Sequence, residues 1–287
     1  MNSIKGIEIA KAAFSDIQSF FYHSSNFIIK KELNVTNMRE HASYAGVDEH
    51  SRIKLSIDLC SNENLSLEDY FFTLLIISHE LAHYLNFHNS HKGVETIDSV
   101  AIEARADNFG AQIFLTLITF GKSTKKNMHL ISSNINQEIL SVEIGKAIGK
   151  LFTSLFSNNN SSKYPSPEHR VFLLMAGCLS FFNRFFGGLS EAWIIQFMLR
   201  VMNNGAPSMM QAEIDVEDKA KQISLRIYEI HKDLQLKSVF MVSGLKPVFG
   251  YFLTSNFNLS DQKREQHKVQ LEKMVSSFSI LQSTENA

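Results

Sequence analysis

The chain has 287 residues, with 28 Lys or Arg against 29 Asp or Glu and a formal net charge of −1. At 44% hydrophobic residues it is too apolar for a disordered chain, and its balanced charge argues against nucleic acid as the main partner. Glycine (13) and proline (4) are scarce, so long uninterrupted helices are expected.

The N-terminal part of the chain predicts one helix and two strands. Residues 4–22 carry apolar side chains at helical spacing, and residues 27–35 form a short candidate strand. Residues 39–50 are polar and predict a loop. Residues 53–59 alternate apolar and polar side chains, which predicts a strand with one buried face.

A pair of helices is predicted next. Ser66 followed by Asp69 is typical of a helix start, because a hydroxyl cap and a carboxylate three residues later satisfy free backbone N–H groups. This helix should cover residues 67–88, and its first half is apolar nearly all round, so we expect it to be buried. Residues 89–93 predict a turn, and a second helix over residues 95–120 follows.

The second half of the chain predicts helices only. The predicted ranges are residues 136–156, 164–186, 190–202, 209–236 and 260–278, with a polar loop at 157–162. The expected fold is therefore mainly α, with a small strand region and C-terminal helices.

Cysteine usage and hydropathy bear on the compartment. Cys60 and Cys178 lie in separate apolar segments, which favours two buried reduced thiols over a disulfide. No apolar run is as long as a membrane span, and the first residues do not resemble a signal peptide. We expect a cytoplasmic protein without a transmembrane segment; surface attachment to a membrane stays open.

The residues that carry chemistry begin with His79, Glu80 and His83. Positions i and i+4 lie on one face of a helix, so the two imidazoles could hold one metal ion. Glu80 would then be placed to act as a general base on a water at that metal, as in zinc peptidases. The alternative is a buried helix with two incidental histidines.

Glu103 is the expected third ligand. The midpoint of His79 and His83 lies about 10 Å before the end of the first predicted helix, and Glu103 lies about 12 Å into the second, at about 1.5 Å per residue. If the helices are antiparallel, the three side chains lie at nearly the same height along the helix pair. Asp107, one turn further, is suited to accept the ring N–H of His79. The alternative is a solvated pair of acidic residues.

The residues that follow His83 exclude one other pattern of zinc ligands. A metzincin site would need a glycine at position 86 and a histidine at position 89, but the chain has Asn86 and Asn89. His88 is one position before the required histidine at 89, and it is expected either in contact with a ligand, without binding the metal itself, or on the surface. Ala106 and Gly110 are small and would let the two helices approach closely.

Three segments together resemble the gluzincin peptidases: HELAHYLNFH (79–88), IEARADNFGAQIF (102–114) and YPSPEHRVFLL (164–174). Within that group they are similar to the HtpX/CAAX-protease-like family and to Lit-like phage-exclusion peptidases. The resemblance implies a zincin-like pair of active-site helices with the third segment nearby, so that Tyr164, His169 or Arg170 could contact the substrate. The chain departs from the pattern in having Tyr164 where a histidine is usual.

These patterns predict a zinc metalloendopeptidase that acts on an intracellular protein. Residues 1–205 would form the peptidase domain, and residues 206–287 a helical extension or part of the same domain. The strand at 53–59 is expected at a sheet edge, where it could pair with substrate. The resemblance implies phage exclusion, with elongation factor Tu as the first substrate to try. The alternatives are a degenerate peptidase fold that binds a protein and a zinc hydrolase of a small substrate.

Overall fold

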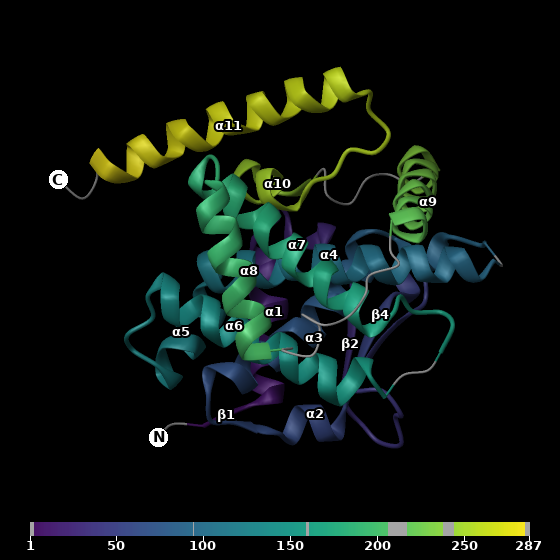
Figure 1. Cartoon of the computed structure of the whole chain (residues 1–287), viewed down its shortest axis with the longest axis vertical. Helices are drawn as coiled ribbons and strands as arrows, with labels where there is room; N and C mark the ends of the chain where they lie inside the picture. The colour runs from purple at the N-terminus through teal and green to yellow at the C-terminus, as the bar shows by residue number, and fades with distance from the viewer. Residues whose placement is uncertain (1–2, 94, 159–160, 206–216, 238–243, 285–287) are drawn as a thin grey trace.

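The computed structural model describes residues 3–93, 95–158, 161–205, 217–237 and 244–284. It is mainly helical, with a small sheet region and C-terminal helices, as predicted (Figure 1). The helices are α1 (Gly6–Ser19), α2 (Ile57–Ser61), α3 (Leu67–Leu85), α4 (Thr96–Phe120), α5 (Lys122–Ile131), α6 (Gln137–Leu151), α7 (Pro167–Phe186), α8 (Glu191–Gly205), α9 (Glu217–Lys237), α10 (Pro247–Leu253) and α11 (Asp261–Thr284). The strands are β1 (Ile4–Lys5), β2 (Lys30–Val35), β3 (Ala42–Ala45), β4 (Arg52–Ser56) and β5 (Glu63–Asn64).

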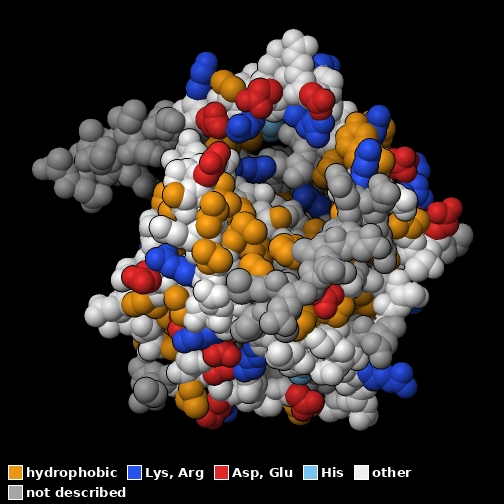
Figure 2. All heavy atoms as spheres, in the orientation of Figure 1, with side chains coloured by type: hydrophobic (Ala, Val, Ile, Leu, Met, Phe, Trp, Pro, Cys, Tyr) orange, Lys and Arg blue, Asp and Glu red, His pale blue; other side chains and the backbone are white. Residues whose placement is uncertain are grey.

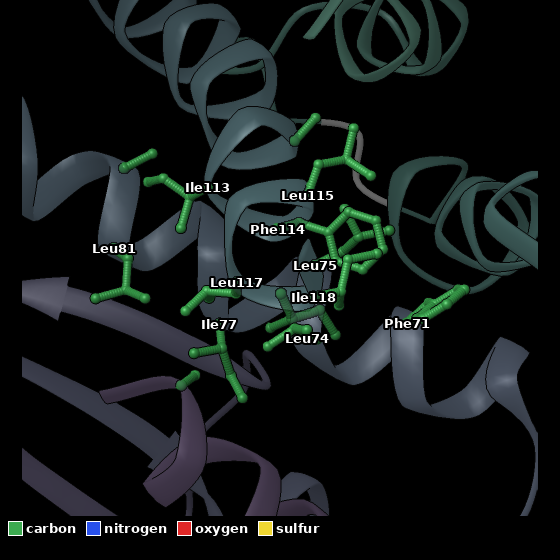
Figure 3. Packing of buried hydrophobic residues seen from close by; sticks show 14 of the residues in the cluster. Phe71, Leu74, Leu75, Ile77, Leu81, Ile113, Phe114, Leu115, Leu117 and Ile118 are labelled. Atoms are coloured by element: carbon green, nitrogen blue, oxygen red, sulfur yellow. The ribbon is translucent and has the colours of Figure 1, made fainter. Parts of the chain in front are cut away.

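Helices α3 and α4 form the centre of the fold. They are antiparallel, because Phe71 near the start of α3 meets Phe114 near the end of α4, with ring centroids 5.2 Å apart. Figure 3 shows their apolar side chains pointing toward one another. Nearly every residue of α3 is buried, which confirms that this helix, apolar nearly all round, lies in the interior.

The start of α3 is set by its cap. Ser66 Oγ accepts the backbone N–H of Asp69 at 3.1 Å and donates to the Asp69 carboxylate at 2.8 Å. The predicted start is confirmed, whereas the end comes earlier than predicted, at Leu85. Phe87 has a left-handed backbone with φ of 55°, which breaks the helix and leads into the short turn η3 (His88–Ser90).

A three-stranded sheet packs against α3 through its strand β3. Its order is β2-β4-β3, with β2 parallel and β3 antiparallel to β4. The predicted edge position of residues 53–59 is wrong, since β4 is the central strand and ends at Ser56. Ser56 caps α2 by accepting the N–H of Leu59, so Ile57 leaves the sheet and is 43% exposed.

The edge strand of this sheet is β3, within residues 39–50, which the sequence predicts as a loop. That prediction is wrong, because β3 is formed by pairing with β4, for example Ala42 with Leu55. Pairing is a long-range interaction, and the short segment Ala42–Ala45 carries no alternating pattern of its own.

The C-terminal helices pack onto this centre. α9 contacts α4 through two small apolar clusters, Val100, Ala104 and Ile223 in one and Ala101, Ile230 and Leu234 in the other. α10 belongs to the main core, and α11 runs across one end of the molecule (Figure 1). The short helices α5 and α10 were not predicted. The helix predicted over 209–236 corresponds to α9, and its first residues, 209–216, lie outside the described part.

The two cysteines do not form a disulfide. Cys60 and Cys178 are buried and free, as predicted. None of the helices in the described part of the chain has the length and apolar character needed to cross a bilayer.

Figure 2 shows hydrophobic side chains gathered in the middle of one face, over the region of α7 and α8. Both helices carry exposed large apolar residues, among them Phe185 and Ile195.

The close approach of α7 and α4 generates a stability prediction. A Cβ on Gly177 would lie 2.1 Å from the backbone oxygen of Asn108, so Gly177→Ala should force the helices apart. We expect a loss of at least about 2 kcal/mol in unfolding free energy, measured by urea denaturation. Gly250→Ala is the matched control, because nothing lies within 4 Å of its added Cβ. Equal stability of the two variants would contradict this packing.

Candidate metal centre

The antiparallel pairing of α3 and α4 brings three ligand atoms together. His79 Nε2 lies 3.0 Å from His83 Nε2 and 3.2 Å from Glu103 Oε2, and His83 Nε2 lies 3.6 Å from the same oxygen. In the described part of the chain, these three residues form a group that could hold a metal ion. Counting helix rise from the turn had pointed to Glu103, and this is the carboxylate that the structure brings to the two histidines.

The chemistry of these atoms favours a cation between them. His79 Nδ1 faces Asp107 Oδ1 at 3.0 Å, so the ring N–H is directed there and the Nε2 lone pair points into the centre. Glu103 Oε2 is buried and has no hydrogen bond of good geometry. Two ligands on tetrahedral bonds of about 2.0 Å are about 3.3 Å apart, which matches the observed separations. The residues present therefore fit a bound metal ion.

Charge in the centre leads to the same conclusion. Burial by itself would lower the pKa of His79, but the carboxylates of Asp107 and Glu103 outweigh it and raise that pKa to about 10. Burial would raise the pKa of Glu103, yet the neighbouring imidazoles lower it below its usual range. The two carboxylates therefore favour positive charge between them, which a bound divalent cation would supply in place of the second imidazole proton.

Asp107 is held by a buried arginine. Arg170 from α7 donates Nε and Nη2 to the two oxygens of Asp107 at 2.8 and 2.9 Å. Its guanidinium also lies over the rings of Phe156 and Tyr164, at 3.9 and 4.9 Å from their centroids. Burial opposes ionisation of Asp107, but Arg170 outweighs it and lowers the pKa of the carboxylate. Arg170 therefore acts through Asp107 to orient His79.

Glu80 lies beside the three ligands at the wall of a cleft. The cleft has two adjoining cavities, of about 630 and 700 Å³, and both are lined by His79, Glu80 and Tyr164. Burial is the main reason that the pKa of Glu80 is raised, although the two histidines oppose this. The backbone of Tyr44 on β3 lies near this carboxylate and partly offsets the rise in its pKa. This carboxylate is therefore a proton acceptor stronger than an exposed glutamate.

The third predicted segment contributes two of its three residues. Tyr164 and Arg170 line the cleft, and burial is the largest cause that raises the pKa of Tyr164 to about 12. His169 is not among the described residues that line it. The backbone N–H of His169 donates to Ser166 Oγ at 3.3 Å, so the segment also starts α7 with a serine cap.

Two more histidines lie near the centre: His88, which is buried in contact with a ligand rather than on the surface, and His231, which the sequence analysis did not single out. His88 Nδ1 lies 2.7 Å from His83 Nδ1, and His88 Nε2 lies 2.9 Å from Nε2 of His231 on α9. Burial lowers the pKa of both, that of His231 to about 3. His231 follows Ile227 by four residues and Ile230 by one, so a histidine on the apolar face of an amphipathic helix was the available signal.

Comparisons with known proteins assign no family to the chain. No family model matches the chain, and neither a curated protein nor a solved structure is significantly similar to it.

Substitution of the two carboxylates tests the ligand set. Glu103→Ala removes an atom of the triad and should abolish binding of one divalent metal ion per chain. Asp107→Ala leaves the triad in place and should weaken binding by about 10- to 100-fold, because His79 loses its orienting partner. Glu49→Ala, on an exposed carboxylate, is the control. Metal content after dialysis is the measurement, and loss of all metal from Asp107→Ala alone would contradict the assignment.

Proposed function

We propose that the chain is a zinc-dependent endopeptidase, with His79, His83 and Glu103 as zinc ligands. The proposal depends on one observation, a metal-binding triad that opens into a cleft directly beside a buried carboxylate, Glu80. Two imidazoles and one carboxylate are a ligand set typical of catalytic zinc, which keeps a further position for water or substrate. A purely structural zinc site has no need of a base at that position.

When bound, zinc would act as a Lewis acid that polarises the scissile carbonyl and acidifies the attacking water. Glu80 would take the proton of that water and deliver it to the leaving amine. Its raised pKa suits both steps, because a carboxylate that is too acidic cannot hold the proton between them.

Tyr164 is suited to stabilise the transition state. Its pKa of about 12 keeps the phenol protonated at neutral pH, so it can donate a hydrogen bond to the developing oxyanion. The guanidinium of Arg170 lies against the Tyr164 ring and fixes its position at the cleft. Arg170 itself is engaged with Asp107, so its role is positioning.

The shape of the cleft favours a peptide as substrate. The two cavities adjoin at His79 and Glu80, so an extended chain could occupy both with its scissile bond near the triad. The edge strand β3 lines both of them through Ala42 and can add an extended peptide by backbone hydrogen bonds. The larger cavity is partly lined by Leu75, Ile76 and Leu155, which would accept an apolar side chain.

The substrate and the biological role are proposed from the sequence resemblance and not from the cleft. Action on an intracellular protein and a role in phage exclusion stay predictions from the resemblance. They are tested by comparing phage plating on cells that carry the wild type or an inactive variant.

The general-base role is tested by Glu80→Gln. The amide has nearly the same shape as the carboxylate but cannot take a proton, so peptide cleavage should fall by at least about 100-fold with unchanged zinc content. New protein N-termini are mapped in cells expressing the wild type or Glu80→Gln. Cleavage products that persist with zinc-loaded Glu80→Gln would contradict the assignment.

Tyr164→Phe serves as the second variant in the same assay. It retains the ring that lies against Arg170 and loses only the hydroxyl. With a substrate identified by the N-terminal mapping, kcat should fall while KM and zinc content change little, because the hydrogen bond forms in the transition state. An unchanged kcat would exclude Tyr164 as the donor.

A further inference from the structure

A continuous line of imidazoles connects His83 to helix α9. His83 Nδ1 lies 2.7 Å from His88 Nδ1, and His88 Nε2 lies 2.9 Å from His231 Nε2. The line ends at the backbone carbonyl of Ile227, 2.7 Å from His231 Nδ1. Successive rings are nearly perpendicular, with centroids 4.8 and 5.1 Å apart.

The terminal carbonyl decides the direction of every hydrogen bond in this line. A carbonyl oxygen can only accept, so His231 Nδ1 carries the hydrogen and Nε2 of the neutral ring is an acceptor. His88 must then donate from Nε2, which leaves its Nδ1 as an acceptor. His83 in turn donates from Nδ1 and presents a bare Nε2. The opposite direction would place the bare Nδ1 of His231 against the carbonyl oxygen.

Burial protects this arrangement from exchange with water. His88 and His231 are 2% and 1% exposed, so both rings must be satisfied by protein groups.

The helix that carries His231 is fixed relative to the ligands. Ile230 and Leu234, on either side of His231 in the sequence, pack against Ala101 of α4. α4 also carries Glu103, so the last imidazole and the third ligand are positioned by one helix.

We propose that His88 and His231 are positioning residues that hold His83 in the tautomer whose Nε2 is free to bind the metal. The inference rests on the proposed zinc centre and extends it to a residue 143 positions from His88 in the sequence. Two ligands are then oriented by different means, His79 by a carboxylate and His83 by a chain of neutral rings. A segment outside residues 1–205 thereby becomes part of the metal centre.

The first test is the tautomer of each ring in the wild-type chain, by long-range ¹H–¹⁵N NMR on protein labelled at histidine and loaded with zinc. We expect hydrogen on Nδ1 of His83, on Nε2 of His88 and on Nδ1 of His231. Hydrogen on Nδ1 of His88 would overturn the proposal. This measurement needs no variant, so a folding defect cannot obscure it.

The second test is zinc affinity by chelator competition. His231→Leu removes the acceptor for His88 and should weaken zinc binding by about tenfold, as loss of a partner behind a ligand does. His231→Gln places an amide oxygen near the former Nε2 and should restore affinity close to that of the wild type. His129→Leu, on the exposed face of α5, is the control.

The outcomes separate the two proposals. Equal affinity of His231→Leu and the wild type would overturn the positioning role and leave the zinc centre intact. Failure of the wild type itself to bind zinc would overturn the zinc centre and, with it, the role of His88 and His231 in orienting His83 toward the metal.

Discussion

The separation between α3 and α4 is the constraint on which the candidate centre depends. A Cβ on Gly110 would lie 3.1 Å from the Cα of His79, so the two backbones are close to the minimum distance at the ligand. At that distance a glutamate on α4 reaches the imidazoles one helix away. A wider spacing would separate Glu103 from His79 and His83 and leave three largely buried polar groups without a common partner.

Around this pair, each functional side chain is held by a group from a different part of the chain. α7 supplies Arg170 for Asp107, β3 places the backbone of Tyr44 near Glu80, and α9 supplies His231 for His88. Such support restricts the rotamers of the groups that would contact metal and substrate, which reduces reorganisation during the reaction. The contacts also explain why the polar residues can be buried, since most of them have a partner.

The sequence predicted the parts of this arrangement that depend on local geometry. His79 and His83 share a face because of helical periodicity, and Glu103 was selected by counting helix rise on either side of a short turn. The cap at Ser66 and the burial of α3 were equally local. Strand β3 was missed because its position depends on pairing with β4, and Ile57 was misplaced because the cap at Ser56 ends the strand.

The contribution of α9 was missed for a related reason. His231 is brought to His88 by the packing of two distant helices, and no spacing rule connects them. Its position on the apolar face of α9 was a visible signal, but a histidine there is compatible with an ordinary buried contact. Only the line of hydrogen bonds from the carbonyl of Ile227 to His83 gives it a chemical role.

X-ray absorption at the zinc edge of the purified, zinc-loaded protein tests the metal centre most directly. The proposed centre predicts a shell of two imidazole nitrogens and carboxylate oxygen at about 2.0–2.1 Å, with no sulfur. That shell should be lost in Glu103→Ala. A sulfur shell at about 2.3 Å, which would indicate Cys60 or Cys178, or an unchanged spectrum in Glu103→Ala, would contradict it.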